Sequence, residues 1–195
     1  MSKIVPTIWS QELHTKAKHL ILKAYFQSWL AIVGQKFQKI VYVDGFCGPG
    51  IYENNEPGSP ILAINSAIEV LKTLESRGTL KAEKVELYFF DSDKDRIESL
   101  KNEVSKIVIN NPRLKVVIEQ GEFEEKVLPI VQILQRERAI YGMISPSLFF
   151  LDPFGVKGFS LSLIGEIFKL NSSEMFLLFD EIGRASCRER VCLYV

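Results

Sequence analysis

The sequence predicts an α/β domain built on a doubly wound, mostly parallel sheet with helices on both faces. Short, almost unbroken apolar runs alternate along the chain with longer segments of helical periodicity. Strands that are buried on both faces have such unbroken runs, whereas strands with one solvated face alternate polar and apolar residues. In addition, an acidic residue follows each of four successive runs, as expected where parallel strands end at one shared edge.

Length and composition agree with one domain of this class. The chain has 195 residues, of which 47% are hydrophobic and 25% charged, and its formal net charge is zero. A neutral chain has no overall basic field, so any contact with nucleic acid has to be local. No apolar run approaches the ~20 residues of a membrane helix and the start lacks signal-peptide features, so we expect a cytoplasmic protein without membrane contact. Three widely separated cysteines indicate neither a disulfide framework nor a metal site.

The first helix is predicted over Thr7 to Val33 and ends at Gly34. Apolar residues at spacings of three and four predict its packing stripe, which consists of Leu13, Ala17, Leu20, Ile21, Ala24, Ser28 and Ile32. Tyr25 and Trp29 are expected to pack on the sheet. His19 could reach a ligand from this helix, although an exposed, unperturbed histidine is the expectation.

Further strands and helices follow in strict alternation. Strands are predicted at Ile40–Val43, Val85–Phe90, Lys115–Glu119, Ser147–Leu151 and Met175–Phe179. Helices are predicted from Ser59 to about Ser76, after Asp93, around Val127–Leu134 and near Leu161–Leu170. Ser59 followed by proline is a favoured helix start with serine as N-cap, and Asp93 is expected to cap the next helix.

The last 15 residues, 181–195, are interpreted as a tail foreign to the natural protein. The string EIGRASCRERV, from Glu181 to Val191, resembles a translated sequencing adapter. The domain is therefore expected to span residues 1–180, with about five strands, and to be incomplete at its C-terminus. Its fifth strand would then leave an unprotected sheet edge.

The stretch IVYVDGFCGPGIY, from Ile40 to Tyr52, is the candidate cofactor site. Glycines after a strand allow positive φ and let the main chain approach a ligand. A dinucleotide fingerprint has the order G-x-G-x-x-G and presents a helix N-terminus to a pyrophosphate. Here the order is G-x-x-G-x-G and Asp44 precedes it, a carboxylate that would repel pyrophosphate but accept hydrogen bonds from an ammonium group.

This pattern favours S-adenosylmethionine (SAM) as the cofactor and disfavours a nicotinamide dinucleotide. The residues expected to bind it are Asp44, Gly45, Phe46, Gly48 and Gly50. The alternative is a glycine turn that binds no ligand. Cys47, inside the turn, is expected to be a small packing residue rather than a reactive thiol.

The later strand ends complete the candidate site. Asp91 is expected to accept both ribose hydroxyls, and Glu122 to accept the adenine amino group. The alternative is that these acids only face solvent and cap helices. The sequence Asp152-Pro153-Phe154 resembles the Asp/Asn-Pro-Pro-aromatic motif of methyltransferases that act on exocyclic amines, with the aromatic residue one position early. The resemblance implies that these three residues are catalytic, although Phe154 could instead pack in the core.

The span from about Trp9 to Asp180 resembles the three-Cys-motif partner (TcmP) proteins. The resemblance rests on HTKAKHLILKAYFQSWL, on YVDGFCGPG followed by GSPILA, on LYFFDSD and on SLFFLDPFGVKG. It implies a Rossmann-like SAM methyltransferase fold and a partner that carries a three-cysteine motif and is encoded nearby. The implied activity is methylation of an exocyclic amine of a base in DNA or RNA. The alternative is a non-catalytic SAM- or nucleotide-binding subunit of a mobile-element or phage-defence system.

Overall fold

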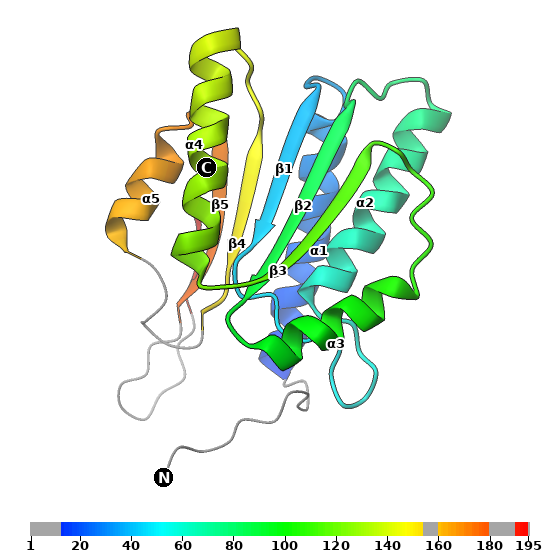
Figure 1. Cartoon of the computed structure of the whole chain (residues 1–195). Helices are drawn as coiled ribbons and strands as arrows, with labels where there is room; N and C mark the ends of the chain where they lie inside the picture. Colours follow the sequence, from blue (N-terminus) through cyan, green and yellow to red (C-terminus); the bar gives the residue numbers. More distant parts are fainter. Residues whose placement is uncertain (1–12, 154–159, 180–189, 195) are drawn as a thin grey trace.

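The sheet of the protein has six strands within the part of the chain that the structure describes. The structure is a computed structural model, and it describes residues 13–153, 160–179 and 190–194. The strands follow the order β3-β2-β1-β4-β5-β6 (Figure 1). They are β1 (Lys39–Asp44), β2 (Lys84–Asp91), β3 (Leu114–Gln120), β4 (Ser147–Leu151), β5 (Ser173–Phe179) and β6 (Arg190–Tyr194). Strands β1 to β5 pair in parallel, and β6 pairs antiparallel with β5.

Helices cover both faces of this sheet. One face carries α1 (Leu13–Val33), α2 (Ser59–Ser76) and α3 (Lys94–Ser105), and the other carries α4 (Phe123–Tyr141) and α5 (Leu161–Phe168). Because side chains alternate along a strand, Tyr42 packs toward α1 and α2 while its neighbour Val43 packs toward α4. The predicted doubly wound α/β fold is confirmed. None of the described helices has the length and apolarity needed to cross a membrane.

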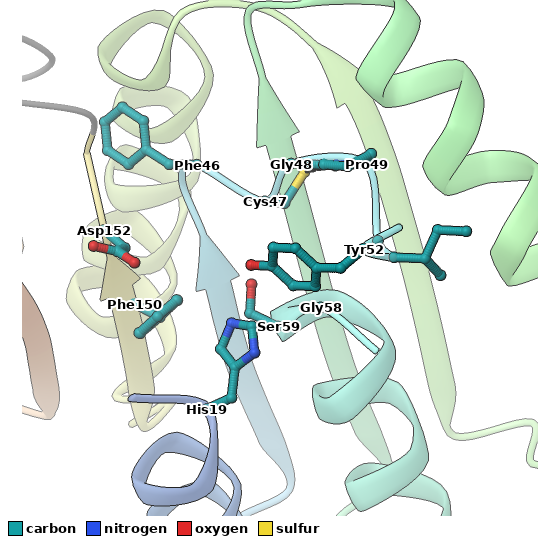
Figure 2. A pocket seen from close by; sticks show the side chains of 12 residues that line it. His19, Phe46, Cys47, Gly48, Pro49, Tyr52, Gly58, Ser59, Phe150 and Asp152 are labelled. Atoms are coloured by element: carbon teal, nitrogen blue, oxygen red, sulfur yellow. Dashed lines mark hydrogen bonds between the residues drawn. The ribbon is translucent and has the colours of Figure 1, made fainter. Parts of the chain in front are cut away.

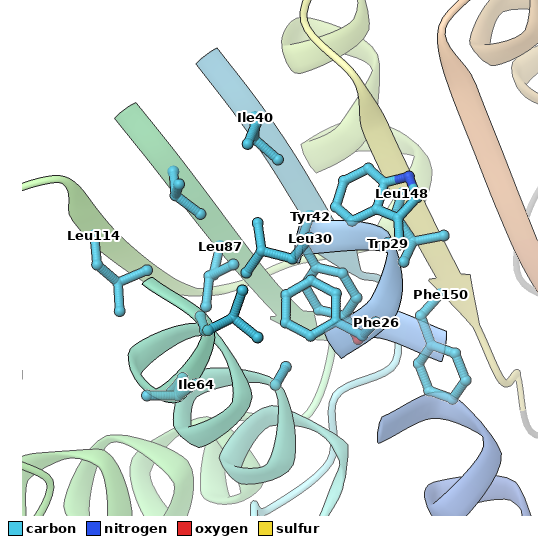
Figure 3. Packing of buried hydrophobic residues seen from close by; sticks show 14 of the residues in the cluster. Phe26, Trp29, Leu30, Ile40, Tyr42, Ile64, Leu87, Leu114, Leu148 and Phe150 are labelled. Atoms are coloured by element: carbon cyan, nitrogen blue, oxygen red, sulfur yellow. The ribbon is translucent and has the colours of Figure 1, made fainter. Parts of the chain in front are cut away.

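Aromatic side chains fix α1 on the sheet (Figure 3). The ring centroid of Phe26 lies 4.8 Å from that of Tyr42 on β1 and 6.1 Å from that of Trp29. The indole Nε1 of Trp29 donates a hydrogen bond of 3.0 Å to Glu174 of β5, and the Tyr25 hydroxyl donates to the same carboxylate. The expectation that Tyr25 and Trp29 pack on the sheet is therefore confirmed.

The packing stripe predicted for α1 is wrong. Its described side chains, Ala17, Leu20, Ile21, Ala24, Ser28 and Ile32, are exposed. The buried stripe consists of Leu22, Phe26, Trp29, Leu30 and Val33. Both stripes have helical spacing, and the larger apolar area of Phe26 and Trp29 explains which of them faces the core. Residues 7–12 of the predicted helix lie outside the described residues.

The edge of β5 is not unprotected. Strand β6 pairs with it, and Phe176 is in register with Leu193. The expectation of a free edge was therefore wrong. Any extended segment can pair with an open strand through its backbone, so the foreign origin of residues 181–195 stays a prediction.

Candidate functional site

A cavity lies at the carboxyl ends of β1 and β4, where the strand order reverses direction (Figure 2). In open α/β sheets this reversal creates the crevice in which ligands bind. The cavity is lined by the loop that follows β1, the start of α2, one residue of α1 and the end of β4. The lining residues are His19, Phe46, Cys47, Gly48, Pro49, Gly50, Ile51, Tyr52, Gly58, Ser59, Phe150 and Asp152.

The loop after β1 crosses the end of the sheet from one neighbouring strand to the other. The Gly45 N–H donates a hydrogen bond of 3.2 Å to the Phe150 carbonyl of β4. Two residues later, the Cys47 N–H donates a hydrogen bond of 3.0 Å to the Phe90 carbonyl of β2. The loop thus closes the gap between the two strands that flank β1.

Two further N–H groups of this loop donate to carboxylates. The Phe46 N–H donates to Asp44 Oδ1 at 3.3 Å, and the Gly48 N–H donates to Asp91 Oδ2 at 3.1 Å. The N–H groups of residues 45–48 therefore all have protein acceptors. A phosphate-binding loop instead points several N–H groups at its ligand, so this loop is not built as a phosphate cradle.

The glycines of the loop serve different purposes. Gly48 and Gly50 have φ of 64° and 85°, a left-handed conformation that favours glycine. At Gly45 the requirement is packing, since a Cβ there would lie 2.2 Å from the Phe123 ring. The need for glycine therefore comes from the backbone conformation of the loop at Gly48 and Gly50, and from packing against α4 at Gly45.

Asp44 lies behind the cavity wall and is fully buried. The pKa of Asp44 is raised to about 7, mainly by burial and to a smaller extent by the negative charges of Asp152 and Asp91. Hydrogen bonds from Ser59 and from the Phe46 N–H act in the opposite direction. Near neutral pH this carboxyl group therefore exists in both protonation states.

The start of α2 differs from the prediction. Gly58 is the N-cap, with extended backbone angles, and the helix begins at Ser59. Ser59 as N-cap was therefore wrong, because its hydroxyl donates a 2.7 Å hydrogen bond to Asp44 Oδ2 instead of accepting from the helix. Pro60 does lie in the first turn, as predicted.

Asp91 holds the loop in place from the end of β2. It is buried, and its second oxygen, Oδ1, accepts a hydrogen bond of 2.9 Å from the Asp93 N–H. The guanidinium of Arg96 lies 3.6 Å from Oδ2. Asp93 caps α3 as predicted, accepting from two N–H groups of its first turn. A ribose-binding role for Asp91 stays a prediction, and ribose hydroxyls would share its oxygens with these donors.

Asp152 reaches the cavity wall from the end of β4 and contacts α1. The ammonium of Lys18 lies 3.5 Å from Asp152 Oδ1, and the Lys18 side chain is only 8% exposed. Pro153 is buried, whereas Phe154 lies outside the described residues. The sequence did not single out Lys18, because it is one of three similar lysines on α1 and only the tertiary contact distinguishes it.

His19 is buried, so the expectation of an exposed histidine was wrong. Its ring centroid lies 5.8 Å from that of Tyr52, and both side chains line the cavity. The pKa of His19 is lowered to about 4, mainly by burial and to a smaller extent by the nearby Lys18 ammonium. The imidazole is therefore neutral at pH 7. Burial raises the pKa of Tyr52, so its hydroxyl stays protonated.

Cys47 and Glu122 occupy contrasting positions. Cys47 belongs to the buried core, as predicted for a packing residue, and burial raises the pKa of its thiol well above the usual value. A thiol in that state is a poor nucleophile. Glu122 is exposed at the N-cap of α4, and its side chain makes no capping hydrogen bond. It does not line the cavity.

Seven of the ten predicted site residues form two groups, and Glu122, Pro153 and the undescribed Phe154 belong to neither. Phe46, Gly48, Gly50 and Asp152 line the cavity, while Asp44, Gly45 and Asp91 support its loop from behind. Among the described residues, no cluster of three histidine, cysteine or acidic side chains could hold a metal ion.

The chemistry of the cavity fits a cationic or neutral ligand such as SAM. Its described lining contains one carboxylate, Asp152, and neither lysine nor arginine. Its volume is about 40 Å³, which holds water but is far below the ~300 Å³ of sites for larger molecules. Because His19 and Tyr52 meet across the cavity in Figure 2, a nucleoside ligand requires these two side chains to move.

No protein-family model and no curated protein matches the chain. Among solved structures, the chain is similar to a putative methylase from Haemophilus influenzae, with 16% sequence identity and a TM-score of 0.34. The similarity covers 85% of this chain and 74% of that one. Similarity at this level supports no conclusion about activity, and the assignment of the fold rests on the strand order and pairing described above.

Proposed function

We propose that the protein is a SAM-dependent methyltransferase that acts on the exocyclic amine of a base in DNA or RNA. The observation that carries the proposal is the charge of the cavity at the strand-order reversal. Asp152 is in its wall, Asp44 and Asp91 lie behind the loop, and no cation lines the described part of it. This environment favours a cationic sulfonium nucleoside over a phosphate-bearing dinucleotide.

The residues that would hold SAM are those of the loop after β1. The backbone of Gly48 and Gly50 has no side chain to obstruct a ligand, and Phe46 and Phe150 provide apolar surface in the cavity wall. When bound, SAM supplies an activated methyl group. The protein excludes water and orients the acceptor.

Asp152 is the proposed acceptor-binding residue. A carboxylate at the end of β4 can accept hydrogen bonds from an amino group and so direct the nitrogen lone pair toward the cavity. The Lys18 ammonium holds Oδ1 at 3.5 Å, which restricts the orientation of the carboxylate. A base in a duplex would have to leave its stack to reach this depth, so a single-stranded or flipped base is the expected substrate.

Two measurements on the purified chain test the proposal. Calorimetric titrations should show binding of SAM but not of NAD, because the N–H groups of residues 45–48 already donate to protein acceptors and leave none for a pyrophosphate. Transfer of a labelled methyl group from SAM should be detected on DNA or RNA, and Asp152→Ala should reduce it by about 100-fold, a larger factor than that by which it weakens SAM binding. The matched control is Asp95→Ala, which removes an exposed carboxylate from α3. Transfer that is unaffected by Asp152→Ala would remove Asp152 from the mechanism.

One observation favours a second candidate, a non-catalytic SAM- or nucleotide-binding subunit of a mobile-element or defence system. The carboxylate expected to receive the acceptor amine already contacts an ammonium group, that of Lys18. In this case SAM or a nucleotide would bind, and no methyl transfer would occur with DNA, RNA or protein acceptors. The two titrations and the transfer assay therefore distinguish the candidates.

We also propose a three-Cys-motif protein, encoded nearby, as the partner. This part of the proposal rests on the sequence resemblance to the TcmP proteins. Co-expression of the two proteins followed by size-exclusion chromatography tests it, since a stable pair elutes as one complex of the summed mass. Separate elution at micromolar concentration would contradict a stable partnership.

A further inference from the structure

We propose that a groove beside α1, here called the α1 groove, binds one nucleotide of a single nucleic acid strand. Its lining includes Lys16, His19, Leu20, Lys23, Glu56 and Leu62, and its volume is about 290 Å³. The inference rests on the proposed function and deepens it, because it names the surface that would hold the acceptor strand.

The position of the α1 groove connects it to the candidate acceptor residue. His19 lines both the groove and the cavity, so the two spaces adjoin at this side chain. The residue before it, Lys18, contacts Asp152 at 3.5 Å. A base held in the groove would therefore lie next to the wall that contains Asp152, and movement of His19 would join the two spaces.

The apolar part of the groove lining suits the face of a base. Leu20 is 69% exposed there, and Pro57 and Leu62 add apolar surface. His19 contributes a ring that is neutral at pH 7, since burial lowers its pKa to about 4. Leu20, Pro57 and Leu62 offer apolar surface that an unpaired base can cover, and the neutral, buried His19 ring provides no counter-ion for phosphate.

The charged part of the groove lining suits a phosphate. Lys16 and Lys23 both belong to the lining. Lys16 forms a 2.8 Å ion pair with Glu56, and Lys23 has no acidic partner among the described residues. The sequence of α1 contains three lysines and no acid. A second copy of α1 would bring like charges together, whereas a phosphate is complementary. One uncompensated lysine matches one phosphate, which favours a single nucleotide over a duplex footprint.

Binding of labelled oligonucleotides to the full chain tests this inference. Fluorescence anisotropy with single-stranded DNA and RNA of about 10 nucleotides is measured without SAM at several salt concentrations. Lys23→Glu is expected to weaken binding by about tenfold and to lower the slope of log Kd against log salt by about 1. Leu20→Glu, at an exposed position that folding does not need, is expected to weaken binding by a similar factor of about 10.

The matched control is Lys72→Glu, which makes the same charge change at an exposed position of α2 outside the groove. It is expected to change binding by less than about twofold. Absence of oligonucleotide binding by the wild type, or equal losses with Lys72→Glu and Lys23→Glu, overturns the inference. The inference is also overturned if the groove binds a protein partner in a Lys23-dependent way and binds no oligonucleotide.

The oligonucleotide-binding test can succeed or fail separately from the test of methyl transfer. Oligonucleotide binding that requires Lys23 and Leu20, without methyl transfer, supports the groove and contradicts the enzyme. Methyl transfer to nucleic acid that both groove variants leave unchanged supports the enzyme and contradicts the groove.

Discussion

The hydroxyl of Ser59 donates a 2.7 Å hydrogen bond to Oδ2 of Asp44, and this contact joins the first turn of α2 to the end of β1. Both groups are buried. Since the hydrogen bond stabilises the carboxylate, it opposes the effect of burial on the pKa of Asp44. Ser59 therefore ties the end of β1 to the first turn of α2.

Ser59→Ala is expected to lower the free energy of unfolding by about 1–3 kcal/mol, because Asp44 loses a buried donor. Ser66→Ala is the matched control on the same helix. The Ser66 hydroxyl is buried and has no hydrogen-bond partner within the described residues, so its removal should cost little or stabilise the protein. Urea unfolding monitored by circular dichroism measures both values. Equal losses for the two variants would contradict a specific role of the Ser59 hydrogen bond.

Asp44 makes stability depend on pH. Its pKa in the folded state, about 7, lies above the ordinary value of ~3.9, so the folded protein binds the proton more tightly than the unfolded chain. This contribution is fully present below about pH 4 and is lost as the pH rises through about 7. Asp44→Asn removes it. The difference in free energy of unfolding between Asp44→Asn and the wild type should therefore shift in favour of the variant as the pH is raised from 5 to 8.

Urea unfolding of wild type and Asp44→Asn at both pH values measures this difference. A difference that stays constant with pH, or that moves in favour of the wild type, would show that the folded protein does not raise the pKa of this carboxyl group.

Glycine is required at position 50 for two reasons, its positive φ and its close packing. Position 78 shares only the positive φ, so comparison of the two positions separates the two effects. A Cβ at Gly50 would lie 2.7 Å from Leu100 Cδ1 and would sit on a residue with φ of +85°. Gly78 also has positive φ, at +66°, but a Cβ there has no neighbour within 4 Å. Gly78→Ala should cost about 1–2 kcal/mol of backbone strain. Gly50→Ala should cost about 1–3 kcal/mol more, because it also overpacks a buried site.

Thermal or urea unfolding of the two glycine variants gives the comparison directly. If Gly50→Ala is no more destabilising than Gly78→Ala, the close packing of the loop against α3 is incorrect.

The contact between Lys18 and Asp152 should be stronger than that between Lys16 and Glu56 on the same helix. The side chains of the first pair are 8% and 28% exposed, whereas both members of the second are 40% exposed. A double-mutant cycle of Lys18→Met with Asp152→Asn is expected to give a coupling energy of about 1–3 kcal/mol. The cycle of Lys16→Met with Glu56→Gln should give about 0–1 kcal/mol, because solvent screens the exposed pair.

The coupling energies of both cycles are measured by urea unfolding at low and high salt. The coupling of the exposed pair should fall with added salt, and that of the buried pair should fall less. A buried-pair coupling no larger than the exposed one would argue against Lys18 as the residue that orients Asp152.

The sequence by itself determined the fold class. Local preferences and burial on both faces produce the periods of the strands and helices. These periods, and the acids at the strand ends, are visible in any short window of sequence. The capping role of Asp93 and the positive φ of Gly48 and Gly50 were predictable for the same reason, since each depends on the local backbone. The close contact of Gly45 with Phe123 of α4 was not.

Tertiary structure alone decided which groups meet. Two stripes of α1 have the same helical spacing, and only contact with the sheet showed that Phe26 and not Leu20 is buried. In the same way, Ser59 caps no helix because Asp44, 15 residues away, accepts from its hydroxyl, and Lys18 reaches Asp152 across 134 residues of sequence. Such partners are chosen by distance in space and by the cost of leaving a buried polar group unsatisfied, and neither is encoded in local sequence.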